Sequence, residues 1–430
     1  MTSMSKTASG SSANTTGSRI QRVVSAGGIE AWLIEEYAVP LIALELSFAG
    51  GAAQDGAAKA GLANFLTGML DEGAGPYDAA QFQEQLEESA IQLRFSESRD
   101  ELAGSLKTLT RHADKAFELL RLTLNEARFD AVAIDRVRAQ ILGGLKRKAN
   151  DPNARSSEAW FRKAFAGHAY GLPEAGLAEA LEAIRAEDLR AQAKRLIARS
   201  NLKISVVGAI DAKRLASVLD RVFANLPAEA ELTPVPHATP KGMGETEVID
   251  LDVPQSTIRF GLPGLLLKDE DFVAGNVMNH ILGGGSFTSR IWQEVREKRG
   301  LAYSVSTGLY PYRNAGLFFG GTATKNDRAK EALEVIRDEL AKMAAEGPSE
   351  AELDRAKRYL VGSYALRFDT STKIANQLTM MQVENLGIDY ISRRNAMFEA
   401  VTLDDARRVA KKLLSPGTML VTVAGRPVGF

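Results

Sequence analysis

The feature that most constrains the fold of this chain is an internal repeat. Residues 134–145 (IDRVRAQILGGL) resemble residues 353–364 (LDRAKRYLVGSY), and residues 202–208 (LKISVVG) resemble residues 419–425 (MLVTVAG). The offset is 219 residues for the first pair and 217 for the second. Because the two offsets nearly agree, we interpret the chain as two halves with a common fold; chance similarity between amphipathic segments is the alternative.

A proline-rich segment separates the two halves. Residues 227–244 contain four prolines. Proline fixes φ and removes a hydrogen-bond donor, so such a segment resists both helix and central strand. A chain of 430 residues also suits two domains of ordinary size. We therefore predict an N-terminal domain at residues 19–226, a linker at 227–244 and a C-terminal domain at 245–430.

Each half mixes strand and helix periodicity. Residues 31–34 and 41–48 predict a pair of strands divided by a turn near Pro40. Residues 114–125 and 327–344 carry apolar side chains at helical spacing. Strand pairs followed by runs of helices indicate α+β domains with largely antiparallel sheets packed against helices.

Composition excludes several classes of function. The net charge is −1 and charges of both signs are mixed along the chain, so we expect no nucleic-acid and no membrane partner. No apolar segment approaches the ~18 residues that span a bilayer. The absence of cysteine excludes disulfides and thiolate metal sites. The four histidines are His112, His168, His237 and His280, and no two have the spacing of zinc ligands on one helix.

The first 18 residues are rich in Ser, Thr, Ala and Gly, without the apolar core of a signal peptide. We predict that residues 1–18 form a disordered tail. We predict a cytoplasmic location, or a periplasmic one if an export signal has been removed from the sequence given.

One segment in the first half looks like a metal site without ligands. Residues 61–73 (GLANFLTGMLDEG) resemble the helix that carries the inverted zinc motif His-x-x-Glu-His in the pitrilysin, insulysin and mitochondrial-processing-peptidase family. In that motif two histidines bind zinc and the glutamate acts as general base. The matching positions here are Asn64, Thr67 and Gly68, which offer neither imidazole nor carboxylate.

The third metal ligand of the family is missing as well. The resemblance places it in residues 140–145, near Gly144 and ahead of Asp151-Pro152, and this stretch contains no acidic residue. We therefore predict no metal and no cofactor on this chain. The alternative is that residues 61–73 form an ordinary packed helix that never bound metal.

A second segment matches the family's C-terminal signature closely. Residues 281–305 read ILGGGSFTSRIWQEVREKRGLAYSV. Helical spacing at residues 289–299 puts Ile291, Trp292 and Val295 on one face, and Gly300 is suited to end that helix in a left-handed conformation. A strand follows at residues 301–306, so the side chains of Arg296 and Tyr303 can converge.

The resemblance gives these two residues a role. In active relatives the matching arginine and tyrosine reach across to the zinc site and hold the substrate, so it implies that Arg296 and Tyr303 act on a partner's zinc site. The residues alone also allow that Arg296 lies on a solvated charged face and that Tyr303 is a half-buried strand residue. Gly283 to Gly285 form a tight turn in this interpretation, since no phosphate-binding Gly-Lys-Ser/Thr follows. We interpret His168 and His280 as structural and His112 and His237 as surface or linker residues.

The resemblance covers nearly the whole chain after residue 18 and implies a subunit that is inactive alone. Its partner would be a homologous zinc-binding subunit, and the heterodimer would be a zinc metalloendopeptidase that acts on peptides or unfolded polypeptides. The rivals are a catalytically silent scaffold and a peptide-binding homodimer of the same fold.

Overall fold

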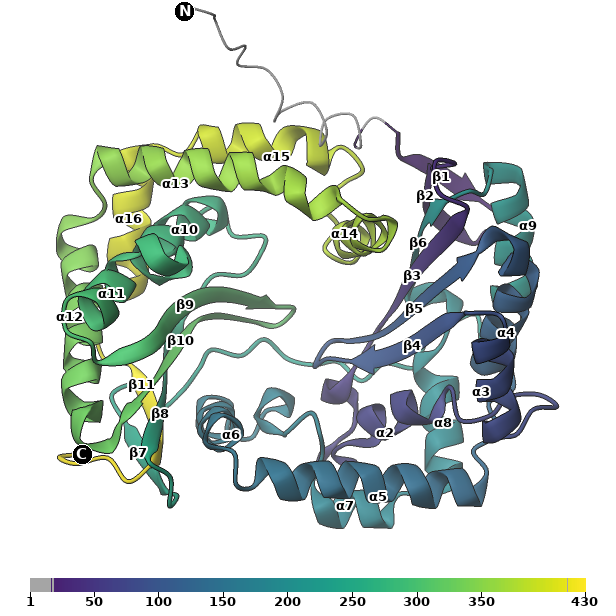
Figure 1. Ribbon diagram of the computed structural model, residues 1–430, viewed down its shortest axis with the longest axis horizontal. Helices are drawn as coiled ribbons and strands as arrows, with labels where there is room; N and C mark the ends of the chain where they lie inside the picture. The colour runs from purple at the N-terminus through teal and green to yellow at the C-terminus, as the bar shows by residue number, and fades with distance from the viewer. Residues whose placement is uncertain (1–16, 18, 416) are drawn as a thin grey trace, which may run out of the picture. The chain divides into compact units, whose positions relative to one another are not determined.

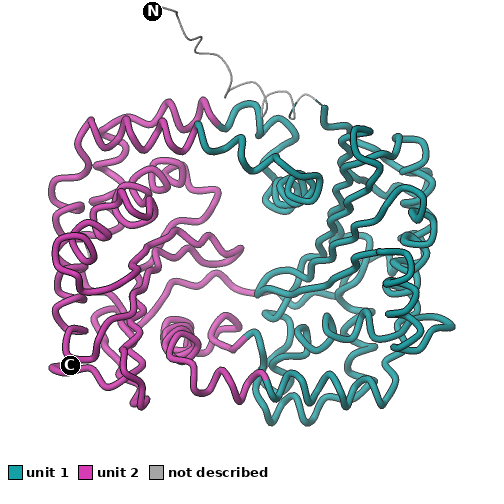
Figure 2. The backbone as a smooth tube through the Cα atoms, viewed as in Figure 1, with its two compact units in different colours: residues 1–143, 174–234, 362–394 teal, residues 144–173, 235–361, 395–430 magenta. Residues whose placement is uncertain are grey.

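The computed structural model describes residue 17, residues 19–415 and residues 417–430. The tail predicted at residues 1–18 lies outside them apart from Gly17. The chain divides into two compact units, each assembled from three separate segments (Figure 2). Unit 1 comprises Met1–Gly143, Glu174–Pro234 and Gly362–Arg394, and unit 2 comprises Gly144–Pro173, Val235–Val361 and Asn395–Phe430.

The described part of unit 1 contains one six-stranded sheet in the order β1-β2-β6-β3-β5-β4 (Figure 1). Neighbouring strands are antiparallel except β2 and β6, which are parallel. The strands are β1 Gln21–Val24, β2 Glu30–Glu35, β3 Leu41–Ala49, β4 Gln92–Glu97, β5 Glu101–Leu109 and β6 Leu202–Gly208.

The predicted strands at residues 31–34 and 41–48 are present as β2 and β3, but the prediction that they pair with each other is wrong. Strand β6 lies between them, parallel to β2 and antiparallel to β3. Its Ile204, Val206 and Val207 are fully buried. An apolar strand of this kind loses more exposed surface at the centre of a sheet than at its edge, so a strand from far along the chain replaces the local hairpin.

Helices cover both faces of this sheet. Helices α4 and α9 pack on one face and α14 packs on β3 and β6 from the other. The helix predicted at residues 114–125 is confirmed as α4. The helices of unit 1 are α2 Leu62–Met69, α3 Ala79–Glu88, α4 Ala113–Asn125, α7 Ala178–Ala183, α8 Ala186–Leu196, α9 Ala212–Phe223 and α14 Ser371–Val383, while α5 Ala131–Lys148 begins in unit 1 and ends in unit 2.

The described part of unit 2 contains a five-stranded sheet in the order β7-β11-β8-β10-β9. Matching β2 to β7, β3 to β8 and so on through β6 to β11 gives the same order in both units, with β1 as an addition in unit 1. The parallel pair also recurs, as β7 with β11. The duplicated α+β fold with largely antiparallel sheets is therefore confirmed. The strands are β7 Thr246–Asp250, β8 Gln255–Pro263, β9 Ala302–Tyr312, β10 Ala315–Lys325 and β11 Leu420–Gly425.

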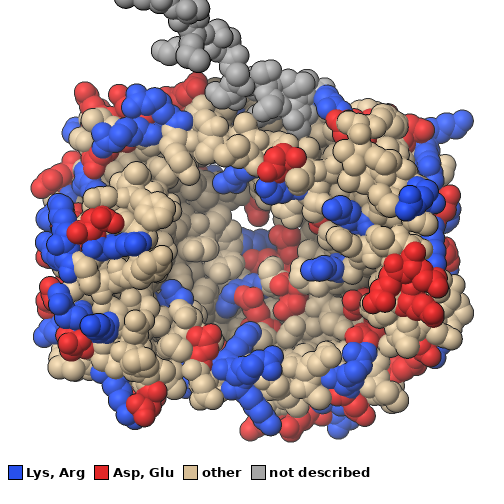
Figure 3. Space-filling model, in the orientation of Figure 1, with Lys and Arg blue, Asp and Glu red and all other residues tan. Residues whose placement is uncertain are grey.

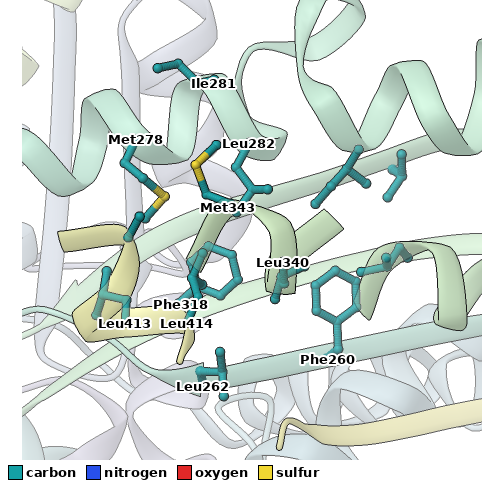
Figure 4. Close-up of a cluster of buried hydrophobic side chains, with 14 of the residues drawn as sticks. Phe260, Leu262, Met278, Ile281, Leu282, Phe318, Leu340, Met343, Leu413 and Leu414 are labelled. Atoms are coloured by element: carbon teal, nitrogen blue, oxygen red, sulfur yellow. The ribbon is translucent and has the colours of Figure 1, made fainter. Parts of the chain in front are cut away.

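The main core of unit 2 lies between one face of this sheet and a layer of helices. Phe260 and Phe318 project from β8 and β10 toward Leu282, Leu340 and Met343 (Figure 4). The helix predicted at residues 327–344 is confirmed as α12. The helices outside unit 1 are α6 Pro152–Ala164, α10 Phe272–Asn279, α11 Arg290–Trp292, α12 Ala329–Glu346, α13 Glu350–Gly362 and α16 Leu403–Leu414, while α15 Tyr390–Glu399 begins in unit 1 and ends in unit 2.

The two halves of the sequence exchange one helix each. Helix α6 comes from the first half but packs on β8 and β11 of unit 2, where the indole Nε1 of Trp160 donates to the Leu420 carbonyl at 3.0 Å. Helix α14 comes from the second half but packs on the equivalent strands of unit 1, where the Gln382 amide donates to the Ile204 carbonyl at 2.8 Å. A folding unit therefore needs segments from both halves, and the division at residues 227–244 stays a prediction.

The mixed surface charge and the polarity of the helices agree with the expectations from composition. Lys and Arg are interspersed with Asp and Glu over the face drawn in Figure 3. Within the described residues, no helix is both long enough and apolar enough to cross a bilayer. The compartment stays a prediction.

Candidate functional site

The three positions of the degenerate zinc motif lie on α2, where Asn64 and Thr67 form hydrogen bonds with neighbouring groups. The Asn64 side-chain amide donates to the Ala175 carbonyl at 3.2 Å. The Thr67 hydroxyl is buried, 2.9 Å from the Asn64 carbonyl and 3.0 Å from Glu97 Oε2. Both side chains are therefore engaged in hydrogen bonds with neighbouring groups.

Gly68 leaves no room for a larger side chain. A Cβ atom built on Gly68 would lie 3.2 Å from Cγ1 of Val137 on α5, which is closer than most Cβ contacts in proteins. A side chain at this position would therefore require Val137 to shift by a few tenths of an ångström.

A carboxylate that the sequence motif did not identify organises the start of α2. Asp55 accepts from the backbone N–H groups of Gly61 at 3.1 Å and Ala63 at 3.0 Å, and from the Gln192 side chain at 3.2 Å. These bonds satisfy N–H groups that a helix start leaves without partners. Burial raises the pKa of Asp55 to about 7. Asp55 therefore serves as a buried cap.

The residues present do not fit a zinc ion. Asn64, Thr67 and Gly68 supply an amide, a hydroxyl and no side chain, and Gly144, the position of the third ligand, lies on α5 without a side chain. Across the described ranges 19–415 and 417–430, no three His, Asp or Glu side chains are grouped so that they would hold a metal. Zinc in proteins is bound by imidazole, thiolate or carboxylate groups at ~2.0–2.3 Å.

The structure brings Arg296 and Tyr303 together in unit 2. The Arg296 guanidinium carbon lies 4.4 Å from the centre of the Tyr303 ring and 4.6 Å from the centre of the Trp292 ring. Arg296 NH1 also donates to the Tyr303 carbonyl at 3.1 Å. The cation therefore contacts two aromatic rings, each contact being worth ~0.5–2 kcal/mol. Tyr303 is 80% exposed, so its hydroxyl faces solvent.

Local sequence explains this convergence. The predicted helix at residues 289–299 begins as α11 and continues as a π-helical turn over Gln293–Glu297, a wide turn frequent at functional sites. Gly300 then adopts φ +58°, as the sequence predicts, and β9 begins two residues later. This reversal returns Tyr303 over Arg296. The preceding glycines 283 and 284 lie in another π-helical turn, His280–Gly284.

The charges beside Arg296 are largely paired with one another. Glu294 bonds Lys298 and Arg299, and these bonds lower its pKa. Arg290 forms a two-point ion pair with Glu352, both bonds 2.7 Å long, which lowers the pKa of Glu352 to about 2. The latter pair fastens α11 to α13. Arg296 has only a 3.9 Å approach to Glu297, so its main neighbours are the aromatic rings.

Sequence reasoning missed the contribution of Trp292. It placed Trp292 on the apolar face of a helix, and the side chain is indeed buried, but its ring also stacks on the Arg296 guanidinium. The spacing of four residues on one helix was the available signal. Exposed Phe287 packs edge-on against Trp292 at 4.8 Å, which extends the aromatic surface toward solvent.

The histidines have local contacts. His168 accepts from the Tyr170 backbone N–H through Nδ1, and its Nε2 lies 2.9 Å from the Pro236 carbonyl. The His280 ring stacks on Tyr359 at 4.9 Å, and burial lowers the pKa of His280. Both contacts agree with structural roles.

Comparison with known proteins agrees with this combination of motifs. Residues 34–176 match the family model described as insulinase, peptidase family M16, and residues 183–360 match the model described as peptidase M16 inactive domain. A crystal structure described as the peptidase M16 inactive domain from Pseudomonas fluorescens has a TM-score of 0.89 and 27% identity, and covers 95% of this chain and 98% of its own.

Some relatives of similar sequence are named as non-peptidase homologues, and others are named as zinc proteases. The non-peptidase homolog YmxG of Helicobacter pylori is 26% identical over 80% of this chain and 79% of its own length. The uncharacterized zinc protease YmxG of Bacillus subtilis is 24% identical over 94% of this chain and 98% of its own length. Because two models of one family match consecutive parts of the sequence and the duplicated fold is shared, this chain belongs to peptidase family M16, as a homologue that resembles its inactive members.

Proposed function

We propose that this chain is the non-zinc-binding subunit of a heterodimeric zinc peptidase. A homologous partner subunit carries the zinc ion and its ligands, and this chain supplies Arg296 and Tyr303 to the bound peptide. The observation that carries the proposal is a contrast between two motifs. The former ligand positions hold packed neutral residues, whereas Arg296 and Tyr303 lie in contact, with the Tyr303 ring in solvent.

The proposed pair has the chemistry that amide hydrolysis requires of a substrate-binding group. Negative charge develops on the carbonyl oxygen of the scissile peptide bond, and hydrogen-bond donors aimed at that oxygen lower the barrier. A guanidinium and a phenolic hydroxyl are such donors. Since the guanidinium contacts the rings of Trp292 and Tyr303 and donates to the Tyr303 carbonyl, little of its motion remains to be lost on binding. Peptides or unfolded segments are the expected substrates.

The exposure of Tyr303 favours this proposal over the scaffold and the peptide-binding homodimer. A scaffold needs buried contacts, and an aromatic ring that is 80% exposed contributes little to packing. A homodimer that only binds peptides does not need donors positioned for a developing negative charge. Two of the relatives, named a non-peptidase homolog and an inactive domain, support a chain that does not hydrolyse peptides alone, although others are named zinc proteases.

The test is reconstitution with a homologue that contains His-x-x-Glu-His. Each subunit alone should cleave a quenched peptide poorly, and the mixture should cleave it well. In the mixture, Tyr303→Phe and Arg296→Ala should each lower turnover by about 10²-fold or more, because each removes a donor that acts mainly in the transition state.

Two matched changes control for surface effects. Tyr37→Phe removes a hydroxyl from a tyrosine of unit 1 that is 60% exposed, and Arg299→Ala removes a cation three residues from Arg296. Neither should change turnover by more than about twofold. If the controls lower turnover as much as the Arg296 and Tyr303 variants, or if those variants keep full turnover, the proposal is wrong.

A further inference from the structure

Arg259 is a cation on the face of the unit 2 sheet against which α6 packs. It lies on β8, whose Ile258 and Phe260 face the core, so Arg259 faces the opposite side, toward α6. Its Nε donates to the Ser157 hydroxyl at 3.2 Å, and its NH2 donates to Asn153 Oδ1 at 3.1 Å. Both acceptors are uncharged groups on the first turns of α6.

No carboxylate of the described residues comes within 4.0 Å of the Arg259 guanidinium to form an ion pair. Arg259 is half-buried, and burial lowers its pKa, while the negative charge of Asp151 acts on it from beyond ion-pair distance. A half-buried charge without a directly bonded counter-ion costs stability. In the same unit Arg290 shows the usual solution, a two-point ion pair with Glu352. Arg259 has the more distant Asp151 but, among the described residues, no carboxylate in hydrogen-bond contact.

The remaining nitrogen of Arg259 is directed across the sheet toward its edge. Residues Arg259, Gly321 and Ser306 are paired side by side on β8, β10 and β9. A Cβ atom on Gly321 would lie 2.2 Å from Arg259 NH1, so the guanidinium occupies the space above this glycine. Beyond it, Ser306 on β9 is exposed. In the described sheet β9 is the outermost strand.

A neighbouring tyrosine completes this surface. The Tyr310 ring lies over Gly308, where a Cβ would be 2.8 Å from Tyr310 Cε2, and Tyr310 is 47% exposed. Gly308 pairs with Phe319, whose ring packs edge-on against Tyr310 at 6.1 Å. An aromatic group thus adjoins the cation, one side-chain row along the strands; Phe319 also packs against Trp160 of α6 at 4.8 Å. We name this set of residues, of which Ser306 and Tyr310 are exposed, the Arg259 strip: Arg259, Ser306, Gly308, Tyr310, Phe319 and Gly321.

We propose that the Arg259 strip binds an extended peptide segment through a carboxylate that pairs with Arg259. This inference rests on the proposed function, in which the substrates are peptides, and it adds a preference for acidic ones. A planar guanidinium recognises a carboxylate with charge-assisted hydrogen bonds. The carboxylate belongs either to an Asp or Glu side chain or to the C-terminus of the peptide.

The strand geometry also gives the spacing of the preferred peptide. Side chains on one face of an extended peptide recur every second residue, at ~3.3 Å per residue. The row that contains Arg259 and Ser306 and the row that contains Phe319 and Gly308 are likewise two residues apart along the strands. A peptide that lies along β9 therefore meets Arg259 with an acidic group and the aromatic surface with an apolar side chain two positions away.

The simpler role for Arg259 is to fasten α6 to the sheet through Ser157 and Asn153. That role needs donors but no charge. Arg259→Gln retains an amide donor while it removes the cation, so binding and stability can be separated. Gly321→Ala provides a second variant that keeps the cation and displaces NH1. Arg162→Gln is the charge-matched control. Arg162 lies on α6, and it already forms an ion pair with Glu247 at 2.5 Å.

The experiment measures peptide binding to the full chain alone by fluorescence anisotropy. Three labelled peptides differ only in carboxylates: one has an internal Glu and an amidated end, one has Gln and an amidated end, and one has Gln and a free C-terminus. The wild type should prefer a carboxylate peptide over the amidated Gln peptide by about tenfold. Arg259→Gln should abolish this preference, Gly321→Ala should reduce it, and Arg162→Gln should keep it. Thermal melts should show that each variant is folded.

The outcomes separate the sources of the carboxylate and the two proposals. A preference for the Glu peptide identifies a side-chain carboxylate, and a preference for the free C-terminus identifies a chain end. Equal binding of all three peptides, no binding, or an equal loss in Arg162→Gln and Arg259→Gln would overturn the inference. Because the assay needs neither partner nor hydrolysis, a preference that survives Arg296→Ala/Tyr303→Phe stands even if reconstitution fails.

Discussion

Replacement of buried Glu45 by glutamine should change how the stability of the chain depends on pH. Glu45 lies on β3 and is 8% exposed. The Ser105 hydroxyl donates to its Oε1 at 2.6 Å, and no described cation forms an ion pair with it. Burial raises the pKa of Glu45 from 4.5 to about 7. Glutamine has nearly the same shape, and the Ser105 hydroxyl can accept from its amide.

The direction in which stability changes with pH follows from the raised pKa of Glu45. The folded chain binds the Glu45 proton more tightly than the unfolded chain, so this contribution to stability is fully present below pH ~4.5 and is lost as the pH rises through ~7. One pKa unit corresponds to about 1.4 kcal/mol. Between about pH 5.5 and pH 8, the wild type should therefore lose about 2 kcal/mol of unfolding free energy relative to Glu45→Gln, as an upper limit.

Urea denaturation at a series of pH values measures this difference directly. The unfolding free energy of Glu45→Gln should exceed that of the wild type most at pH 8, and the gap should narrow toward pH 5. Parallel profiles for the two proteins across this range would refute the argument, because they would mean that Glu45 titrates alike in the folded and unfolded chains.

Three further changes test other parts of the structure. Glu352→Gln should destabilise the chain near pH 7, and the gap should close as the pH falls through the folded pKa of about 2, the opposite sign to Glu45, in the same denaturation series. Trp160→Ala should cost about 3–5 kcal/mol of unfolding free energy, because it empties a fully buried aromatic site and removes the bond to Leu420. Gly68→His should lower the melting temperature through its clash with Val137, whereas Asn64→His should lower it less; equal melting temperatures would contradict the tight packing of α2.

The sequence predicted the fold class because the repeat and the two periodicities are local signals. Helices α4 and α12 follow apolar spacing within single segments, and Gly300 ends its helix as expected. The position of β6 between β2 and β3 was not predictable in the same way. It depends on which strand gains most from burial, which is a property of the assembled sheet. The exchange of α6 and α14 between the units has the same origin.

The candidate site was predictable where residues close in sequence meet. Arg296 and Tyr303 are seven residues apart, and a helix, a glycine and a strand suffice to bring them together. The cap that Asp55 forms on α2 is also local, but it belongs to no motif and was overlooked. Glu97 and Arg259 carried no local signal, since Glu97 reaches Thr67 from a distant strand and Arg259 meets α6 from another part of the chain. Long-range contacts of this kind require the fold.

A reconstituted heterodimer that carries Arg296→Ala and Tyr303→Phe together on this chain decides whether this subunit acts on the substrate. We predict that its turnover falls by at least about 10²-fold at saturating substrate, while assembly with the partner and the partner's zinc content stay unchanged. The Tyr37→Phe/Arg299→Ala heterodimer, measured beside it, should turn over like the wild type. Full turnover in the Arg296→Ala/Tyr303→Phe heterodimer would contradict the account and leave this chain as a scaffold.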